Sequence, residues 1–526
     1  MPESAGSAVG AEHPALPPEV VAAALAVRAE ERRVRAGARH ARRTLTLAGL
    51  AVLVTFLDTT VLFVAFPAIS RTFSSAGPAE LSWVLNAYTI TFAALLVPAG
   101  KLADRLGHKR IFLLGMVLFT VASAACAAAP SAEVLIAFRI VQAIGAAAII
   151  PASLALVMRA FPRDRLPAAV AIWGAMGAVA GAIGPTLGAL LVEGPGWRWV
   201  FLVNVPVGLA TVVFGSRLLT ESRDSETRIP AVLGVILVAA SAALISLGVV
   251  QSDSWGWGSV NTVAAISAGL VLFGLFVIHQ RHTSAPALDL SLFTIRNYAW
   301  ANGATMAFGI AFTAMFFGSY LLLTELWGWS VLEAGLGISP GPILVGILAP
   351  RFGRLAGRIG QRPLLVAGGL AFAAGGVWRL VAIGTTPAYV TAYLPAMLLT
   401  GLGVALTLPQ LSSVTAQALP PNRLGVGGAA NQAIRQLGGT FGVAFTIAIL
   451  AGAGASGTSL LAAFDDVAWL LIAGGLLTSL LVLPLRTGPT AQAPALPEDA
   501  VPVPAVARIE TNEGGQPVFA LELEEA

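Results

Sequence analysis

Apolar stretches long enough to cross a lipid bilayer recur along almost the whole chain, and this feature constrains the fold more than any other. An α-helix of about 20 apolar residues spans the hydrocarbon core. By this length the sequence predicts about fourteen spans, in a chain with only 11% charged residues. We therefore predict an all-α, polytopic membrane protein. The predicted spans lie near 45–67, 80–100, 109–130, 132–158, 167–192, 199–219, 229–251, 259–280, 298–324, 334–350, 363–384, 388–412, 424–452 and 466–486.

The basic residues gather in alternate loops between these spans. Lys101 and Arg105, for example, follow the second span, whereas the intervening loops hold mainly acids and tryptophans such as Trp255. Lys and Arg accumulate in cytoplasmic loops, so this asymmetry predicts a protein of the cytoplasmic membrane with both termini in the cytoplasm. The net charge of +4 is explained by topology, and we expect no nucleic-acid partner.

An internal repeat sets the domain organisation. The loop GKLADRLGHKR at 100–110 is repeated as GRLAGRIGQRP at 353–363, an offset of 253. Further along, residues match at an offset of 258; Pro151, for example, corresponds to Pro409. Two six-span halves are therefore related by a parallel repeat, with two unpaired spans between them. The predicted parts are a basic cytoplasmic tail at 1–43, bundles at 44–222 and 297–486, a two-span linker at 223–296 and a disordered acidic tail at 487–526.

The basic run before the first span could also indicate a signal peptide. The apolar segment that follows is too long, contains an acid and lacks a small-residue cleavage site, so we favour an uncleaved tail. The single cysteine, Cys126, excludes an internal disulfide. Gly100 and Lys101 do not belong to a phosphate-binding loop, so ATP hydrolysis is not expected.

Asp58 lies well inside the first predicted span, where an ionised Asp costs at least about 2.5 kcal/mol. Such a group is tolerated when a proton or a partner neutralises it. Arg139, in the fourth span, is expected at a similar depth, with Gln142 one turn further on. A guanidinium favours the ionised carboxylate and burial favours the protonated acid, so movement between the two environments would load and release a proton. A static structural ion pair is the alternative.

The loop at 100–110 is expected to act as a latch at the cytoplasmic gate. Its glycines permit close packing and a tight turn, and Asp104 is placed to cap or charge-pair with a neighbouring helix end. The alternative is a basic loop that only sets topology. The residues predicted for gating are Gly100, Asp104, Arg105, Gly107, Arg110 and, in the echo of the loop, Arg358.

The fifth span carries glycines at alternating spacings of three and four, which form one smooth face along a helix. Such a face lets a neighbouring helix approach closely and slide or hinge, and a proline within it bends the helix. Val443 stands at the repeat position of that proline, so we expect the device in the first half only. The residues concerned are Gly177, Gly181, Gly184, Pro185 and Gly188.

Other polar or aromatic side chains within spans are candidates for a substrate cavity. Arg435 either faces inward at mid-membrane or snorkels to the cytoplasm, and Arg379 is expected to snorkel. For the aromatic candidates, packing or an interfacial position is the alternative. The cavity candidates are Asn86, Tyr88, Trp173, Gln410 and Arg435.

These motifs resemble those of the major facilitator superfamily and, within it, of the fourteen-span drug:proton antiporter family. The resemblance covers about 45–486. FLDTTVLFVAFPAI at 56–69 is similar to the first-span motif in which the Asp is implicated in proton coupling. The other matching parts are the loop at 100–110, Arg139 with Gln142, the antiporter motif at 177–188 and the span-6 signature WRWVFLVNVPVG at 197–208.

The resemblance implies a monomeric exporter of drugs, antibiotics or similar amphipathic compounds that works by alternating access, driven by the proton gradient without a cofactor or a metal. The second half lacks the mid-membrane acids that some members use for divalent cationic drugs, which argues against dicationic substrates. Two alternatives are a nutrient or metabolite carrier of the same fold and a membrane enzyme or receptor that does not transport. No nucleophile triad, metal cluster or large soluble domain in the sequence favours the latter.

Overall fold

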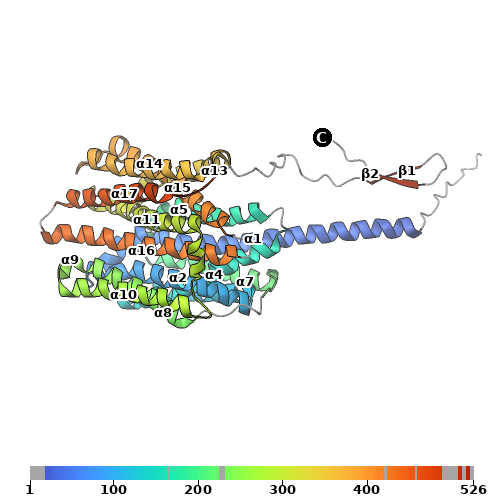
Figure 1. Ribbon diagram of the computed structural model, residues 1–526, viewed down its shortest axis with the longest axis horizontal. Coiled ribbons are helices and arrows are strands. Elements are labelled where there is room, and N and C mark those ends of the chain that lie inside the picture. Colours follow the sequence, from blue (N-terminus) through green and yellow to red (C-terminus); the bar gives the residue numbers. More distant parts are fainter. Residues whose placement is uncertain are drawn as a thin grey trace, which may run out of the picture.

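The computed structural model describes residues 18–162, 166–223, 231–419, 423–456, 459–487, 507–511 and 517–521. Within these residues, fourteen helical segments are long and apolar enough to cross a membrane, which confirms the number expected from the apolar stretches. Figure 1 shows the helices running side by side in one elongated bundle, with α1 projecting from one end. We call that end the N-end, and the opposite end, where α9 lies, the far end.

The first half begins and ends its helices at residues suited to helix termini. Gly107, with a φ of +114°, separates the second helix from the third, a conformation that glycine adopts without strain. Ser131 accepts a hydrogen bond from the backbone N–H of Val134 and so caps the fourth helix. The elements are α1 (Pro18–Thr72), α2 (Pro78–Leu106), α3 (His108–Ala127), α4 (Ala132–Ala160), α5 (Leu166–Glu193), α6 (Trp199–Leu202) and α7 (Asn204–Leu218).

The second half repeats this arrangement, with some of its spans interrupted. The span predicted at 334–350 consists of two helices that meet at Ser339 and Pro340, because proline is favoured in the first turn of a helix and disfavoured inside one. The elements are η1 (Leu290–Thr294), α11 (Arg296–Leu321), η2 (Leu322–Leu326), α12 (Val331–Ile338), α13 (Pro340–Ile359), α14 (Gln361–Ala382), η3 (Tyr389–Tyr393), α15 (Leu394–Gln417), α16 (Leu424–Ser456) and α17 (Leu460–Val482).

The linker consists of α8 (Val232–Val250), α9 (Ser252–Trp255) and α10 (Val260–His282). The α10 helix packs on α8, and α8 packs on both α2 and α16. In Figure 1 the pair lies along the lower side of the bundle. The linker therefore covers the seam at which α2 of the first half meets α16 of the second.

The two ends of the chain differ from the sequence-based expectation. The predicted boundary between a tail and the first span, at residue 43, falls within one uninterrupted helix, α1, because the segment before it is rich in Ala, Glu and Arg, which favour helix. The expectation of a disordered tail is wrong for ten residues, since β1 (Ala507–Thr511) pairs antiparallel with β2 (Pro517–Leu521). These strands carry β-branched and aromatic residues. Residues 1–17 and the rest of the tail after Thr487 lie outside the described residues.

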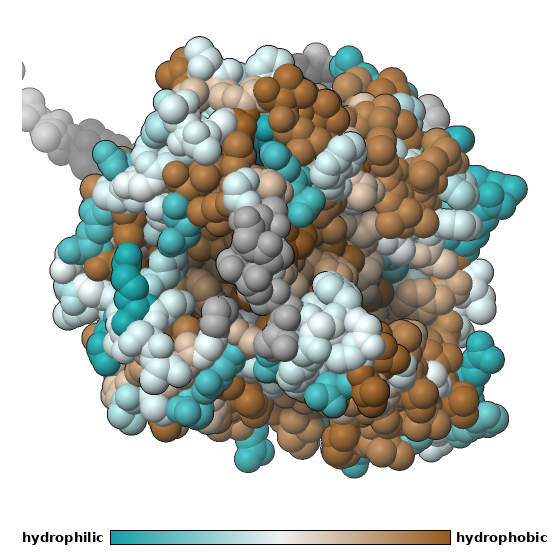
Figure 2. All heavy atoms as spheres, turned by 90° about the vertical axis from the view of Figure 1, so that its left-hand side faces the viewer, coloured by the Kyte–Doolittle hydropathy of each residue, from teal (hydrophilic) through white to brown (hydrophobic). Residues whose placement is uncertain are grey.

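The two halves pack against each other at the far end. The ring of Phe63 on α1 packs against that of Phe317 on α11 in a tilted arrangement, with ring centroids 5.6 Å apart. The hydroxyls of Thr186 on α5 and Ser339 are 2.7 Å apart. Figure 2 looks at this end, where hydrophilic side chains lie among hydrophobic ones. These contacts close the far end of the bundle around α1, α5, α11 and α12.

Candidate functional site

The carboxylate of Asp58, on α1, is held by three side chains from two other helices of the first half. Arg139 on α4 donates from one guanidinium nitrogen to Oδ2 at 2.5 Å. Gln142, one turn further along α4, donates from Nε2 to Oδ1 at 2.8 Å. Asn204, at the start of α7, donates to the same oxygen at 2.8 Å. Both oxygens of the carboxylate are therefore satisfied, and one of the bonds is charge-assisted.

A second set of contacts fixes the side chains that bind Asp58. The Nε2 of Gln142 also donates to the hydroxyl of Ser123 on α3, at 2.7 Å. Arg139 donates from Nε to the carbonyl of Val84 at 3.1 Å, and its guanidinium carbon lies 4.0 Å from the ring centroid of Tyr88. A cation over an aromatic face is stabilised by the ring quadrupole. The orientation of Arg139 is thus set by α2 as well as by Asp58.

This cluster is sealed from its surroundings. Asp58 is 2% exposed, Arg139 is 1% exposed and Gln142 is fully buried. Burial of two charges is tolerated only with excellent geometry and additional hydrogen bonds, and both are present here. Every partner of Asp58 belongs to the first half. In this conformation the carboxylate is buried, and its three hydrogen-bond donors all come from the first half.

The sequence-based pairing of Asp58, Arg139 and Gln142 is reproduced by the geometry, but two participants were missed. Asn204 lies in the stretch at 197–208, which was noted only for its family resemblance, and Ser123 gave no signal within an apolar run. Asn204 could have been found as an amide inside a predicted span, because such polar groups face the bundle interior.

Glycines of α5 allow α1 to approach closely beside this cluster. A Cβ at Gly184 would lie 2.1 Å from the hydroxyl of Thr60, and one at Gly188 would lie 3.2 Å from Val61. At Gly177 the nearest atom, in Phe56, is 3.4 Å away, an ordinary contact. Close approach of helices through small residues is a recurring feature of membrane bundles.

The prediction of one continuous glycine face needs two corrections. A Cβ at Gly181 would meet no atom within 4 Å, so this glycine is not part of the contact with α1. The device is also not confined to the first half. Gly438 and Gly442 of α16 pack against the backbone of α11. An added Cβ at Gly438 would lie 2.8 Å from the carbonyl oxygen of Met306, and one at Gly442 would lie 2.5 Å from that of Ile310. The glycine contact between α11 and α16 thus repeats the contact between α1 and α5, and only Pro185 has no counterpart in the second half.

Pro185 and its neighbours also form the contact with the second half. An added Cβ at Gly335 of α12 would lie 2.7 Å from the carbonyl oxygen of Pro185. Near the end of α5, the carboxylate of Glu193 accepts a hydrogen bond from the backbone N–H of Leu332 at 2.7 Å. The bend expected at Pro185 is therefore located where α5 meets α12.

Known proteins match most of the chain. A family model described as the Major Facilitator Superfamily matches residues 48–443. The chain belongs to this superfamily.

Within the superfamily, the chain is 35% identical over 409 residues to the Multidrug resistance protein Stp of Mycobacterium tuberculosis, covering 78% of this chain and 75% of the relative. It is 32% identical to the Tetracenomycin C resistance and export protein of Streptomyces glaucescens, covering 76% and 74%. An auto-inhibited POT family peptide transporter superposes with a TM-score of 0.62 at 16% identity, over 85% of this chain and 97% of that one. At this identity the likeness to the peptide transporter shows the fold alone.

The loop at 100–110 binds within its own half and to the segment after α10, where the carbonyl of Pro286 accepts a hydrogen bond from Nζ of Lys101 at 2.7 Å. Asp104 contacts His108, the first residue of α3, at 2.9 Å, which agrees with the expected pairing at a helix end. The carboxylate of Glu221 accepts hydrogen bonds from the backbone N–H groups of Lys109 and Arg110, at 3.1 and 3.0 Å. An acid is stabilised at this position by the free N–H groups of a helix N-terminus.

The glycines at 100 and 107 have distinct contacts. An added Cβ at Gly107 would lie 2.6 Å from the carboxyl carbon of Glu221, and one at Gly100 would lie 3.2 Å from Pro151 of α4. Arg105 is exposed, as is Arg358 near the end of α13. The loop is thus clamped to α4 and to the segment after α7, and a latch between the two halves stays a prediction.

The cavity candidates are not gathered at one place in this transporter. Tyr88 packs on Arg139 and belongs to the Asp58 cluster. Trp173 donates from its indole nitrogen to the hydroxyl of Ser153 at 3.0 Å, which supports the packing alternative within the first half. Gln410 is 2% exposed on α15, and Asn86 is fully buried on α2 with both amide atoms unpaired. Of these, Asn86 and Tyr88 carry buried hydrogen-bonding atoms without a partner in the described structure.

Arg379 and Arg435, the two arginines considered within spans of the second half, differ in their surroundings. Arg379, on α14, is buried and donates to the hydroxyl of Ser319, so the expectation that it snorkels is wrong. Its guanidinium carbon lies 5.7 Å from the ring centroid of Tyr393. The direction of the side chain is set by helix rotation, which turns Arg379 toward α11 and away from the membrane surface. Arg435, on α16, is half-buried and donates to Gln432, one turn nearer the N-end.

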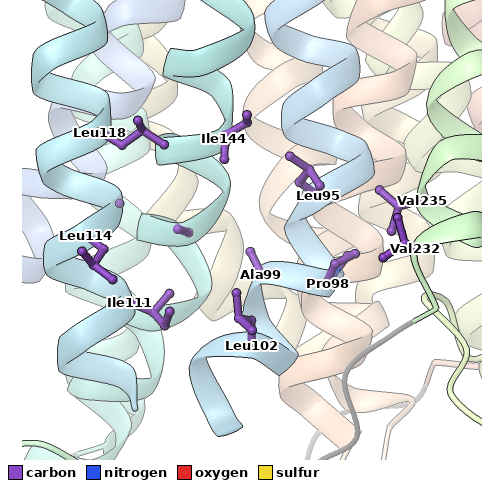
Figure 3. Close-up of a pocket in the computed structure, with 12 residues that line it drawn as sticks. Leu95, Pro98, Ala99, Leu102, Ile111, Leu114, Leu118, Ile144, Val232 and Val235 are labelled. Carbon is purple, nitrogen blue, oxygen red and sulfur yellow. The ribbon is translucent and has the colours of Figure 1, made fainter. Parts of the chain in front are cut away.

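An apolar pocket of about 400 Å³ lies elsewhere, among α2, α3, α4 and α8. Figure 3 shows Leu95, Pro98 and Leu102 of α2 facing it, with Val232 and Val235 of the linker on the other side. All its lining residues are apolar. It therefore offers no hydrogen-bonding group with which a polar substrate could be oriented.

Proposed function

We propose that this protein exports an amphipathic organic compound, such as a drug or an antibiotic, across the cell membrane in exchange for protons. The observation that carries this proposal is the buried carboxylate of Asp58, held by Arg139, Gln142 and Asn204 inside one half of a transporter. The relatives named above are a multidrug resistance protein and a resistance and export protein, which supports drug efflux.

The proposed mechanism depends on what binds the carboxylate of Asp58 when the far end is closed and when it is open. With the far end closed, Arg139, Gln142 and Asn204 all donate to the carboxylate of Asp58, an arrangement that corresponds to the state after proton release. When the halves rock and the far end opens, a proton reaches Asp58 and weakens its bond to Arg139. Alternating access then exposes the substrate site to one side of the membrane at a time.

Two parts of the molecule are suited to this movement. The glycines of α5 and α16 let α1 and α11 slide past them with little side-chain obstruction. Pro185 is located where α5 meets α12, so a change of bend there separates the halves at the far end. The loops at 100–110 and 353–363 are expected to hold the N-end closed in the opposite state.

Topology and assembly are part of the same proposal. The basic loops at the N-end favour a cytoplasmic position for that end. The protein is proposed to function as a monomer in the cell membrane. A cysteine introduced at the exposed Ser75, at the far end, should react with a membrane-impermeant maleimide in intact cells, whereas one at the exposed Ser284, at the N-end, should not. The reverse pattern would invert the orientation.

The test of coupling uses everted membrane vesicles with an acidic interior. Addition of a transported drug should release protons from vesicles that contain the natural protein. Asp58→Asn removes the titratable group, so drug-dependent proton release should be abolished. Asp466→Asn serves as the matched control, because Asp466 is exposed near the far end of α17 and its substitution should leave coupling intact.

Loss of folding in Asp58→Asn is distinguished by a second variant. Asp58→Asn combined with Arg139→Gln removes both charges, and monodisperse purified protein without drug-dependent proton release would support the coupling role. Coupling at the natural level in either variant would refute it. Drug accumulation in whole cells that express the natural protein, in place of resistance, would favour the nutrient-carrier alternative.

A further inference from the structure

The interior of the second half carries a positive charge without an acidic partner. Arg435 donates to the amide oxygen of Gln432, and no ion pair joins it to an Asp or Glu among the described residues. Asp58 is bound to Arg139 in the other half. An unpaired cation in a low-dielectric interior is costly, so such residues in membrane spans are usually functional.

Arg435 lies deep within its helix. It follows Leu424, the first residue of α16, by eleven positions, which places it about 16 Å along the helix axis at 1.5 Å per residue. Its side chain is directed to Gln432, which is still inside the span. The snorkelling alternative therefore fits poorly, because the guanidinium ends beside a buried amide and not at the membrane surface.

The contacts of α16 define which way Arg435 faces. Asn431 donates to Asn302 of α11 at 3.0 Å, and Thr440 donates to Thr89 of α2 at 2.7 Å. At 3.6 residues per turn, these two contacts lie on opposite sides of α16. The α16 helix is thus wedged between α11 of its own half and α2 of the other.

Two arcs of the helix surface separate these contacts, and they differ in chemistry. Polar side chains of a membrane helix face the bundle interior or a water-filled cavity, and apolar ones face lipid or packed helices. The arc that carries Arg435 is therefore the one suited to a polar space between the two halves. One arc carries Gln432, Arg435 and Gly439, and the other carries Ile434, Leu437 and Phe441.

This face keeps unused hydrogen-bond donors. The guanidinium has five N–H groups, of which one nitrogen is engaged with Gln432. The Nε2 of Gln432 is buried and has no partner in the described structure. On the same arc, Gly439 lies close to α11, since an added Cβ would be 3.3 Å from the hydroxyl of Thr313. Planar donors of this kind match a carboxylate or a similar oxyanion.

We propose that Arg435, with Gln432, binds the anionic group of the substrate, so that the transporter is selective for amphipathic acids over amides and amines of the same shape. This inference rests on the proposed export function and specifies its substrate class. Acids elsewhere in the second half, such as Glu325 and Asp465, lie near the far end and do not offer a deep site for a cation.

The test compares three probes that share one apolar body: pyrenebutyric acid, its primary amide and pyrenebutylamine. Binding is measured by fluorescence with the full-length protein in lipid nanodiscs, after subtraction of empty nanodiscs and without a proton gradient. The natural protein should bind the acid about tenfold more tightly than the amide, as expected for a charged hydrogen bond, and the amine most weakly.

The variants separate recognition of charge from general damage. Arg435→Gln should bind acid and amide equally, and Arg435→Lys should recover part of the preference. Arg351→Gln removes an exposed arginine at the N-end and should keep the full preference. Equal binding of acid and amide by the natural protein, failure to bind either, or an unchanged preference in Arg435→Gln would overturn the proposal. Because no gradient is present, these outcomes are independent of whether Asp58 couples transport to protons.

Discussion

Both halves of the molecule bury an arginine, but they give it different partners. Arg139 of the first half is paired with a carboxylate, whereas Arg379 of the second half donates to a hydroxyl and lies near an aromatic ring. Arg379 stands at the repeat offset of 253 from Cys126, whose sulfur lies 3.9 Å from the amide oxygen of Gln142. The two clusters therefore occupy related places in the two halves.

The difference separates a cluster that can change its charge from one that cannot. A proton can neutralise Asp58, and the bond to Arg139 would then weaken. The cluster around Arg379 contains no carboxylate among the described residues and stays positive. Among the described residues, a buried pair of Arg and Asp is therefore present in the first half and absent from the second, which is the arrangement expected if one half handles the proton and the other handles the substrate.

The largest effect is expected when the first-half pair is broken. Arg139→Leu leaves the buried carboxylate of Asp58 without its counter-ion, and breaking a buried pair costs about 3–5 kcal/mol. We expect the free energy of unfolding, measured by SDS titration of the purified protein, to fall by this amount.

The double variant Asp58→Asn with Arg139→Leu should recover most of that stability, because no unpaired charge remains. A double variant as unstable as Arg139→Leu alone would show that packing, and not charge compensation, stabilises the cluster. The comparison between the halves would then lose its physical basis.

Much of this site was predictable because charges are rare in membrane spans. Asp58 and Arg139 could be paired from depth alone, since a helix rises by a fixed distance per residue. Asn204 could have been recognised as an amide inside a span, but its partner and that of Ser123 could not be assigned, because a neutral polar residue does not reveal which neighbour it faces. Arg379 shows the same limit: it was expected to snorkel, but the rotation of α14 decides whether it points to the surface or to Ser319.

The fold was predictable for a related reason. Apolar length fixes the number of spans, and the echo of 100–110 at 353–363 fixes the two halves. The glycine contact of α16 was missed because Gly442 was not compared with Gly184, although the offset of 258 relates them. The position of the linker on the α2–α16 seam depends on side-chain packing between distant segments, which no local pattern encodes.

An intermediate effect is expected at the glycine contacts that both halves share. In Gly442→Ala the new Cβ would lie 2.5 Å from the backbone carbonyl of Ile310, which cannot move aside, so we expect a loss of about 1–3 kcal/mol. In Gly184→Ala the clash is with the hydroxyl of Thr60, which can rotate, so the loss should be smaller. The same SDS titration measures both.

Gly181→Ala is the matched control, because open space surrounds it and alanine favours helix over glycine by up to about 1 kcal/mol. It should be neutral or slightly stabilising. If Gly442→Ala were tolerated as well as Gly181→Ala, the two helix pairs would not be equivalent and the sliding contact would belong to α1 and α5 alone.

The smallest effect is expected at the second-half arginine. Arg379→Met removes the bond to the Ser319 hydroxyl but also removes a buried cation that has no acidic partner, and these two terms oppose each other. Methionine fills a similar volume with flexible apolar atoms, so the free energy of unfolding should change by less than about 1 kcal/mol. Arg351→Met is the control at an exposed position and shows how large a change in the free energy of unfolding an arginine-to-methionine substitution causes there. A loss as large as that of Arg139→Leu would mean that Arg379 is as fully compensated as Arg139, and the contrast between a titratable half and a permanently charged half would fail.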